Sequence, residues 1–176
     1  MPTIVEYARD SAVSQGKDAR QGKYLMLQLD TEEYGIRVLQ VREIIGVQDI
    51  TPVPHTPPHV KGVINLRGKV IPVVDLRLKF GMHAVEASSR ACVIVVQVRG
   101  TVSTTLIGLL VDGVCEVTNL ASQDIEDPPE FAGSLSAPFL LGMAKGKGKV
   151  RILLDIDEVL GTGDLNSLQT MVRSAA

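Results

Sequence analysis

Apolar and polar residues alternate at the spacing of β-strands over most of the chain. Alternation or β-branched runs predict strands near residues 24–30, 34–38, 70–74 and 91–98. A helical period occurs only near the C-terminus, where Leu165, Leu168 and Val172 would share one face of a short helix. The pattern therefore predicts a mainly β chain with short helical turns and a C-terminal amphipathic helix.

The most informative local stretch is residues 62–81, where two apolar runs flank Arg67 and Gly68. Glycine accepts a positive φ at no steric cost, which favours a tight hairpin turn at this point. Pro72 lacks an amide hydrogen, so its strand is expected to lie at a sheet edge or to carry a bulge. Asp75 is placed to cap a one-turn helix that follows the hairpin.

Two patterns occur twice, in the same order along the chain. In the first, Gly35-Ile36-x-Val38-x-x-Val41-x-Glu43-Ile44 returns as Gly108-Leu109-x-Val111-x-x-Val114-x-Glu116-Val117. In the second, Gly68, Lys69, Val70, Asp75 and Gly81 return with unchanged spacing as Gly148, Lys149, Val150, Asp155 and Gly161. We interpret these matches as an internal duplication. Two unrelated β segments of similar composition are the alternative.

The bulk composition narrows the class of protein. The chain has 176 residues, enough for one large domain or two small ones, and each repeat would be marginal alone, so the halves are expected to pack together. The net charge of −2 and an aromatic content of 3% disfavour nucleic-acid binding. The sequence has no apolar run of about 20 residues and no signal-peptide layout, which predicts no direct insertion into a membrane.

Residues that could carry out chemistry are scattered. Cys92 and Cys115 form no CxxC pair and are expected to be buried free thiols. The glycine-lysine tract at 145–149 lacks the hydroxyl residue of a phosphate-binding loop, which favours a hairpin turn. Two prolines between His55 and His59 prevent a continuous helix, so we predict no metal site. No nucleophile-base pair can be proposed, and we predict no catalytic residue and no cofactor.

Glu43 and Arg67 are the remaining candidates, because each is a charge beside apolar strands. They could flank apolar patches that dock a partner and set its register by complementary charge. The alternative is that the two side chains only neutralise each other on a hydrated surface.

The ordered motifs resemble the CheW family. They are Glu33-Tyr-Gly-Ile36, Val41-x-Glu43-Ile44, Val60-Lys-Gly-Val-Ile-Asn-Leu-Arg-Gly68 and Ile71-Pro-Val-Val-Asp-Leu-Arg77. The resemblance runs from about Tyr24 to Leu160. It implies two five-stranded, SH3-like β-barrels and a non-enzymatic chemotaxis adaptor. Such adaptors join the cytoplasmic tip of methyl-accepting chemotaxis proteins to the regulatory domain of a CheA-type histidine kinase, which would recruit a cytoplasmic protein to membrane receptor arrays.

The polar, weakly periodic start of the chain predicts a flexible leader at 1–22, and the helical spacing near its end predicts a C-terminal helix at 163–176. With the repeat, the resemblance places a first barrel at about 23–83 and a second at about 90–162. The implied receptor- or kinase-coupling residues are Val38, Val41, Glu43, Gly62, Arg67, Gly108 and Val117. A purely structural role is an equal expectation for the two glycines, and the second barrel would carry a main kinase contact.

Two other functions stay open at this point. An oligonucleotide-binding tandem β-barrel would associate with single strands in a salt-dependent way. An enzyme whose site is assembled from scattered residues would turn over a small substrate.

Overall fold

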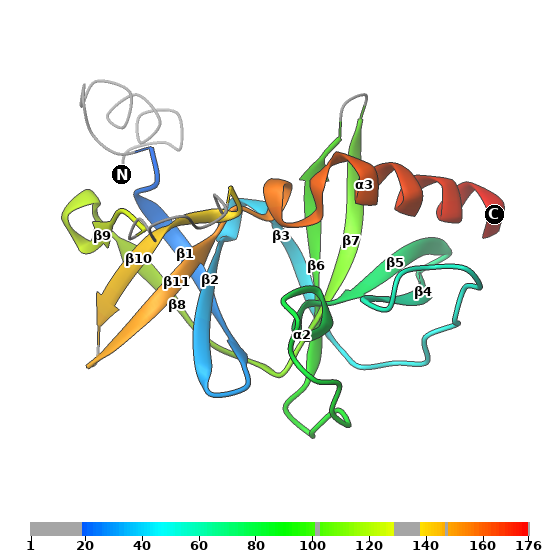
Figure 1. The fold of residues 1–176 in the computed structure, drawn as a ribbon, viewed down its shortest axis with the longest axis horizontal. Helices are drawn as coiled ribbons and strands as arrows, with labels where there is room; N and C mark the ends of the chain where they lie inside the picture. The colour runs from blue at the N-terminus through cyan, green and yellow to red at the C-terminus, as the bar shows by residue number, and fades with distance from the viewer. Residues whose placement is uncertain (1–18, 101–102, 129–137, 147, 176) are drawn as a thin grey trace.

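Two curved sheets lie side by side in the computed structural model, with a short helix at their junction and a longer helix over one of them (Figure 1). The structure describes residues 19–100, 103–128, 138–146 and 148–175. The predicted leader falls outside the described residues up to residue 18.

Sheet A has six strands in the order β8-β1-β2-β11-β10-β9, and sheet B has five in the order β3-β6-β7-β5-β4. The strands of sheet A are β1 (Gly22–Leu29), β2 (Glu32–Arg37), β8 (Gly113–Leu120), β9 (Ile125–Glu126), β10 (Leu140–Gly146) and β11 (Lys149–Leu154). The strands of sheet B are β3 (Val41–Gly46), β4 (Val60–Leu66), β5 (Lys69–Asp75), β6 (Cys92–Arg99) and β7 (Thr104–Val111). The prediction of a mainly β fold is confirmed.

Helical segments are short apart from the last one. They are η1 (Val38–Gln40), α2 (Leu76–Lys79), η2 (Ser122–Asp124) and α3 (Ile156–Ala175). The carboxylate of Asp75 accepts a hydrogen bond from the backbone N of Arg77 at 2.9 Å, as a helix cap does. Helix α3 is kinked at Gly161, where φ is 63°. The predicted C-terminal helix at 163–176 is thus the second part of a longer element that begins at Ile156.

Each sheet combines strands from both copies of the duplicated pattern. The strands β1 and β2 of the first copy pair with β8 and β11 of the second, whereas β3 and β5 of the first pair with β6 and β7 of the second. The sheets therefore do not follow the predicted barrel boundaries at 23–83 and 90–162, which need correction. Those boundaries followed the sequence repeat, but the chain crosses from one sheet to the other inside each repeat, at η1 and at Asp112.

The recurring glycines lie where two strands approach closely. Gly35 pairs with Leu153 in the parallel β2–β11 contact, and Gly108 pairs with Val73 in the parallel β5–β7 contact. A Cβ on Gly35 would lie 2.8 Å from a methyl carbon of Leu153, and one on Gly108 would lie 2.7 Å from a methyl carbon of Val93. The same steric requirement therefore explains the same residue in both copies.

The two copies also share a β-bulge. In β3 the pairing with β6 shifts between Val41 and Glu43, so Arg42 is the extra residue. In β8 the partners of Met26 and Leu27 are Glu116 and Val114, which leaves Cys115 as the extra residue. Both extra residues stand between the valine and the glutamate of the repeated motif, so the duplication extends to the irregularities of the sheets.

The largest core lies between the two sheets rather than inside either one. Leu25, Leu27 and Leu29 of β1 contribute to this shared core, whereas Tyr24 and Met26 belong to a separate cluster within sheet A. A third cluster fills sheet B. Full burial of each leucine contributes roughly 1.5 to 3 kcal/mol, so separating the sheets would be costly. The structure confirms that the two halves pack together.

Two local expectations need correction. Pro72 does not lie in an edge strand, because β5 has neighbours on both sides, but the β4–β5 pairing does carry an irregularity, between Val60 and Gly62 of β4. The ladder from β5 to β7 begins only at Val73, which leaves Pro72 paired with Val63 of β4 alone. Cys92 is buried as expected, but Cys115 is exposed, because it is the bulged residue of an edge strand.

Helix α3 is predicted to be part of the core. Leu168 is 1% exposed and belongs to the shared core, so Leu168→Ala should lower the free energy of unfolding by about 2 to 4 kcal/mol. The matched change Asn166→Ala, two residues away on an exposed position, should alter it by less than about 0.5 kcal/mol. Urea unfolding of both variants tests this, and equal midpoints would show that the helix does not dock.

Candidate docking surface

Glu43 and Arg67 form a bidentate ion pair on sheet B. Arg67 Nη1 donates to Glu43 Oε1 at 3.0 Å, and Nη2 donates to Oε2 at 2.7 Å. The arginine side chain is 76% exposed and the glutamate side chain 27% exposed. The pair joins β3, one edge strand of sheet B, to the turn that follows β4, the other edge strand. We call this junction the seam of sheet B. The two residues therefore do neutralise each other, while one face of the arginine stays open to solvent.

The turn that carries Arg67 has a defined backbone. Arg67 has φ of 51° and Gly68 has φ of 86°, and the side-chain oxygen of Asn65 accepts a hydrogen bond from Gly68 N at 2.8 Å. Consecutive positive φ values are those of a tight hairpin turn, as the sequence predicted. The backbone thus fixes the direction in which the arginine leaves the sheet.

Sheet A has an equivalent acid at its own seam. Glu116 takes the place of Glu43 in the second copy of the repeated motif, and its Oε1 is 3.5 Å from Nη1 of Arg151 on β11. The same Nη1 lies 3.4 Å from Thr118 Oγ1, and the Arg151 side chain is only 6% exposed. The arginine of the Glu116–Arg151 pair is therefore buried, whereas a partner can reach the arginine of the Glu43–Arg67 pair directly.

Exposed apolar side chains lie on or near the edge strands β3 and β8, and on the interior strand β11. Leu39, Ile44 and Val47 lie beside or on β3, with exposures of 89%, 46% and 43%. On the sheet A side, Val117 of β8 is 57% exposed and Val150 of β11 is 46% exposed. Apolar groups beside a charge at a free sheet edge are typical of protein docking surfaces.

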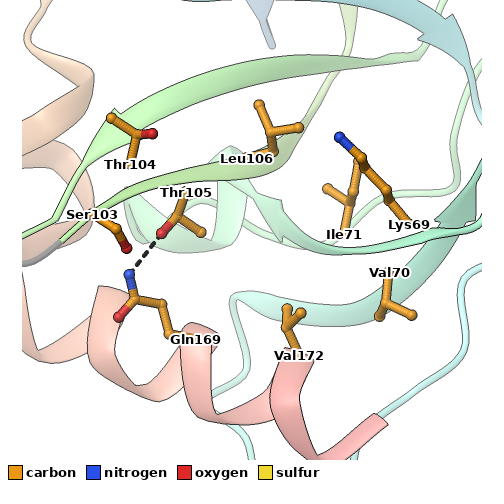
Figure 2. Close-up of a pocket in the computed structure, with 9 residues that line it drawn as sticks. All are labelled: Lys69, Val70, Ile71, Ser103, Thr104, Thr105, Leu106, Gln169 and Val172. Atoms are coloured by element: carbon orange, nitrogen blue, oxygen red, sulfur yellow. Dashed lines mark hydrogen bonds between the residues drawn. The ribbon is translucent and has the colours of Figure 1, made fainter. Parts of the chain in front are cut away.

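A groove of about 390 Å³ continues from the β4–β5 turn toward α3 (Figure 2). Lys69 stands at its rim, and Val70, Leu106 and Val172 line it with apolar groups. Gln169 Nε2 of α3 donates to Thr105 Oγ1 of β7 at 2.7 Å, which fixes the helix at one end of the groove.

A second apolar cavity, of about 600 Å³, lies between the sheets beside α2. The ring centroids of Tyr34 and Phe80 are 5.8 Å apart, and those of Phe80 and Phe139 are 5.7 Å apart. At its rim Lys79 Nζ donates to Asp164 Oδ2 at 2.6 Å, which ties α2 to α3. The stacked rings and this ion pair hold the junction of the two sheets together.

Three side chains near these surfaces have shifted pKa values. Burial and the charge of Lys79 lower the pKa of His59, and Asp164 offsets part of this effect. Burial raises the pKa of the Tyr34 hydroxyl. Partial desolvation of the sulfur, with added repulsion from Glu33 and Glu116, raises the pKa of the Cys115 thiol although the residue is exposed overall.

The sequence-predicted contact residues fall into three places. Glu43 and Arg67 meet at the seam, with Val41 two residues before Glu43 on β3. Val38 and Val41 pack against the shared core, and Val117 lies on the edge strand of the other sheet. The structure therefore does not bring all of these residues into one patch.

The two glycines are in structural positions. Gly62 has φ of 143°, and a Cβ there would lie 2.0 Å from the backbone oxygen of Thr51. Gly108 is the close-contact glycine of β7. The exposed residues Leu39, Ile44 and Val47 were not singled out from the sequence, although two-residue alternation along β3 places Ile44 on the exposed side.

The described residues offer few groups for other chemistry. In this part of the chain no three His, Cys, Asp or Glu side chains lie close enough together to hold a metal ion. None of the described helices is both long enough and apolar enough to cross a membrane.

Comparison with known proteins shows similarity over most of the chain. The family described as CheW-like domain matches residues 23–163. The chemotaxis protein CheW of Klebsiella aerogenes is 36% identical over 152 residues, which cover 86% of this chain and 89% of that protein. The chemotaxis protein CheW of Rhizobium meliloti is 38% identical over 128 residues, covering 73% of this chain and 80% of that one.

A solved structure shows the same architecture. The scaffolding protein TtCheW from Thermoanaerobacter tengcongensis superposes with a TM-score of 0.72 at 33% identity. The match covers 82% of this chain and 95% of that protein. This similarity supports the prediction of tandem SH3-like barrels.

The glycines are predicted to act on stability rather than on binding. Gly62→Ala should lower the free energy of unfolding by more than about 2 kcal/mol, because both its φ and the Thr51 oxygen oppose a side chain. Gly108→Ala should cost about 1 to 3 kcal/mol through crowding against Val93. The control Gly46→Ala, with nothing within 4 Å, should cost less than about 0.5 kcal/mol. Wild-type urea midpoints for the first two variants would contradict this interpretation.

Proposed function

This chain belongs to the CheW-like family, and on that premise we propose that it is a non-enzymatic adaptor of a chemotaxis pathway. Its partners are the cytoplasmic tips of methyl-accepting chemotaxis proteins and the regulatory domain of a CheA-type histidine kinase. The observation that carries the proposal is the exposed Glu43–Arg67 pair on a free edge strand, in a chain similar to CheW proteins over most of its length.

An adaptor needs two separate docking surfaces, and the duplication supplies two related ones. Edge strand β3 borders sheet B and edge strand β8 borders sheet A, and each carries an exposed apolar residue next to a seam glutamate. These residues are Ile44 beside Glu43 and Val117 beside Glu116. We assign the β3 surface to the receptor and the β8 surface to the kinase.

The shared core gives the two surfaces a mechanical connection. Both edge strands pair with a strand whose alternate residues enter that core, β6 for β3 and β1 for β8. The adaptor can transmit a receptor state only if the assembled complex binds the two receptor states with different affinity. Through such partners the chain would be held at membrane receptor arrays.

The oligonucleotide-binding alternative is disfavoured. The net charge is −2, and the exposed arginine at the seam of sheet B is already neutralised by Glu43. The three described aromatic rings at the sheet junction stack on one another rather than forming an open platform for bases.

Reversing the charge of Arg67 tests the receptor surface. Arg67→Glu places two carboxylates at the seam and should reduce receptor-dependent kinase activation at least about five-fold. The fold should persist, because an exposed ion pair of this kind contributes no more than about 1 kcal/mol. The measurement is autophosphorylation of a CheA-type kinase with receptor-containing membranes, alongside a thermal melt.

Two matched variants show whether the loss of activation comes from Arg67 itself or from any change of charge in this region. Lys69→Glu changes the same charge two residues away and should leave activation near the wild-type level. The charge swap Glu43→Arg with Arg67→Glu restores the ion pair with its charges exchanged. It should not restore kinase activation if the partner contacts the arginine at position 67 directly. Full activation by the Arg67→Glu protein would contradict the assignment of this surface.

The kinase surface is tested on the other sheet. Val117→Lys puts a charge on an apolar position of β8 that is 57% exposed, and it should weaken binding to the kinase regulatory domain at least about five-fold. Asn119→Lys, at an exposed site two residues along the same strand, is the matched control and should bind normally. Isothermal titration measures both, and equal affinities would remove β8 from the interface.

A further inference from the structure

A polar cleft of about 410 Å³ opens between η1, the ends of β6 and β7, and the start of α3. Three arginines line it, Arg37 at the end of β2, Arg42 in β3 and Arg99 at the end of β6. The other lining residues are Leu39, Gln40, Gln97, Thr104, Asp155 and Asp157. None of the residues implied to couple receptor and kinase lines this cleft.

The three guanidinium groups have no ionic partner among the described residues, since none of the salt bridges in that part of the chain includes them. The two aspartates of the cleft accept hydrogen bonds from backbone and amide N–H groups rather than from a guanidinium group. Asp157 Oδ1 accepts from the backbone N of Arg99 at 2.9 Å and from Gln40 Nε2 at 3.1 Å. Asp155 Oδ1 accepts from the backbone N of Asp157 at 3.1 Å, as a helix cap. The three arginines thus outnumber the two aspartates of the cleft, and none of them is ion-paired within the described residues.

The duplication shows what closes the corresponding place in the other half of the molecule. There, Arg77 of α2 forms a salt bridge with Asp112, at the bend between β7 and β8. The repeat makes Asp157 the equivalent of Arg77, and Leu39 the equivalent of Asp112. Aspartate and leucine cannot form that bridge, and Leu39 is instead 89% exposed at the cleft. One of the two equivalent junctions between the copies is therefore closed by an ion pair, and the other is open.

Arg42 reaches the cleft from the bulge in β3. It is the extra residue of that bulge, and it lies on the exposed side of the strand with Ile44. Its equivalent in the second copy is Cys115, so a long cationic side chain occurs at this position only in the first copy.

We propose that this cleft binds an acidic segment of a partner protein, with carboxylates on the three arginines and an apolar side chain on Leu39. Guanidinium groups recognise carboxylates through paired hydrogen bonds, which suits aspartate and glutamate side chains. The amide of Gln97 and the hydroxyl of Thr104 can form hydrogen bonds with the backbone of such a segment. The exposed leucine fits a peptide better than a free phosphate, and the net charge of −2 opposes a nucleic acid. The proposal does not depend on the assignment of receptor and kinase surfaces.

The test uses the full chain and a labelled ten-residue peptide with six glutamates and two leucines. The reference peptide has glutamine in place of every glutamate, and fluorescence anisotropy gives Kd at low and at physiological salt. The glutamate peptide should bind at least about ten-fold more tightly than the glutamine peptide, and less tightly as salt rises.

Variants then locate the binding. The triple change Arg37→Gln, Arg42→Gln and Arg99→Gln should weaken the glutamate peptide at least about ten-fold, and Arg42→Gln alone should weaken it measurably. The control Lys23→Gln, Arg90→Gln and Lys149→Gln removes three exposed positive charges that do not line the cleft, and it should bind as the wild type does. Circular dichroism confirms that each variant is folded, and the single variant keeps the test valid if the triple one is not.

Three outcomes would overturn the proposal. They are equal affinity for the two peptides, equal weakening by the cleft and control triple variants, and displacement of the peptide by millimolar inorganic phosphate as effectively as by unlabelled peptide. The last outcome would assign the cleft to a small anion instead.

Discussion

The shared core between the two sheets is the constraint on which the rest of the structure depends. It is formed because each repeat contributes strands to both sheets, so neither sheet is complete without both halves of the chain. β1 and β6 serve both sides, since one set of their alternate residues enters the shared core and the other fills a barrel. A partner that moves an edge strand therefore acts on a unit that spans the molecule.

The seam residues show how the duplicated plan has diverged. Glu43 and Glu116 occupy equivalent places, next to equivalent bulges, but they meet different arginines. Arg67 comes from an exposed turn, whereas Arg151 comes from within a strand and is buried. The Glu43–Arg67 pair thus presents an exposed arginine that a partner can contact, whereas the arginine of the Glu116–Arg151 pair is buried and contributes to the fold. The Arg77–Asp112 bridge and the open arginine cleft differ in the same way.

Much of this could be predicted from the sequence, because local chemistry decides it. The turn at Arg67, the cap at Asp75 and the docked face of α3 follow from residue types at fixed spacing. The duplication was also visible, since Gly35 and Gly108 recur for one steric reason.

The exchange of strands between the sheets could not be predicted in this way. Pairing partners distant in sequence leave no local pattern, and the repeat itself suggested two contiguous barrels. The exposure of Cys115 and the meeting of three arginines at one cleft depend on the same long-range arrangement. The Glu43–Arg67 contact was foreseen only as one of two alternatives, because spacing alone cannot show which face of a charge remains open.

The central claim is that one rigid, interleaved unit presents two separate edges to two partners. Hydrogen–deuterium exchange of the chain, alone and with a receptor-tip fragment, a CheA-type regulatory domain or both, tests it most directly. The account predicts that the receptor fragment protects β3 and the β4–β5 turn, that the kinase domain protects β8, and that both footprints persist together. Protection of the same strand by both partners, or loss of one footprint when the second partner binds, would contradict it.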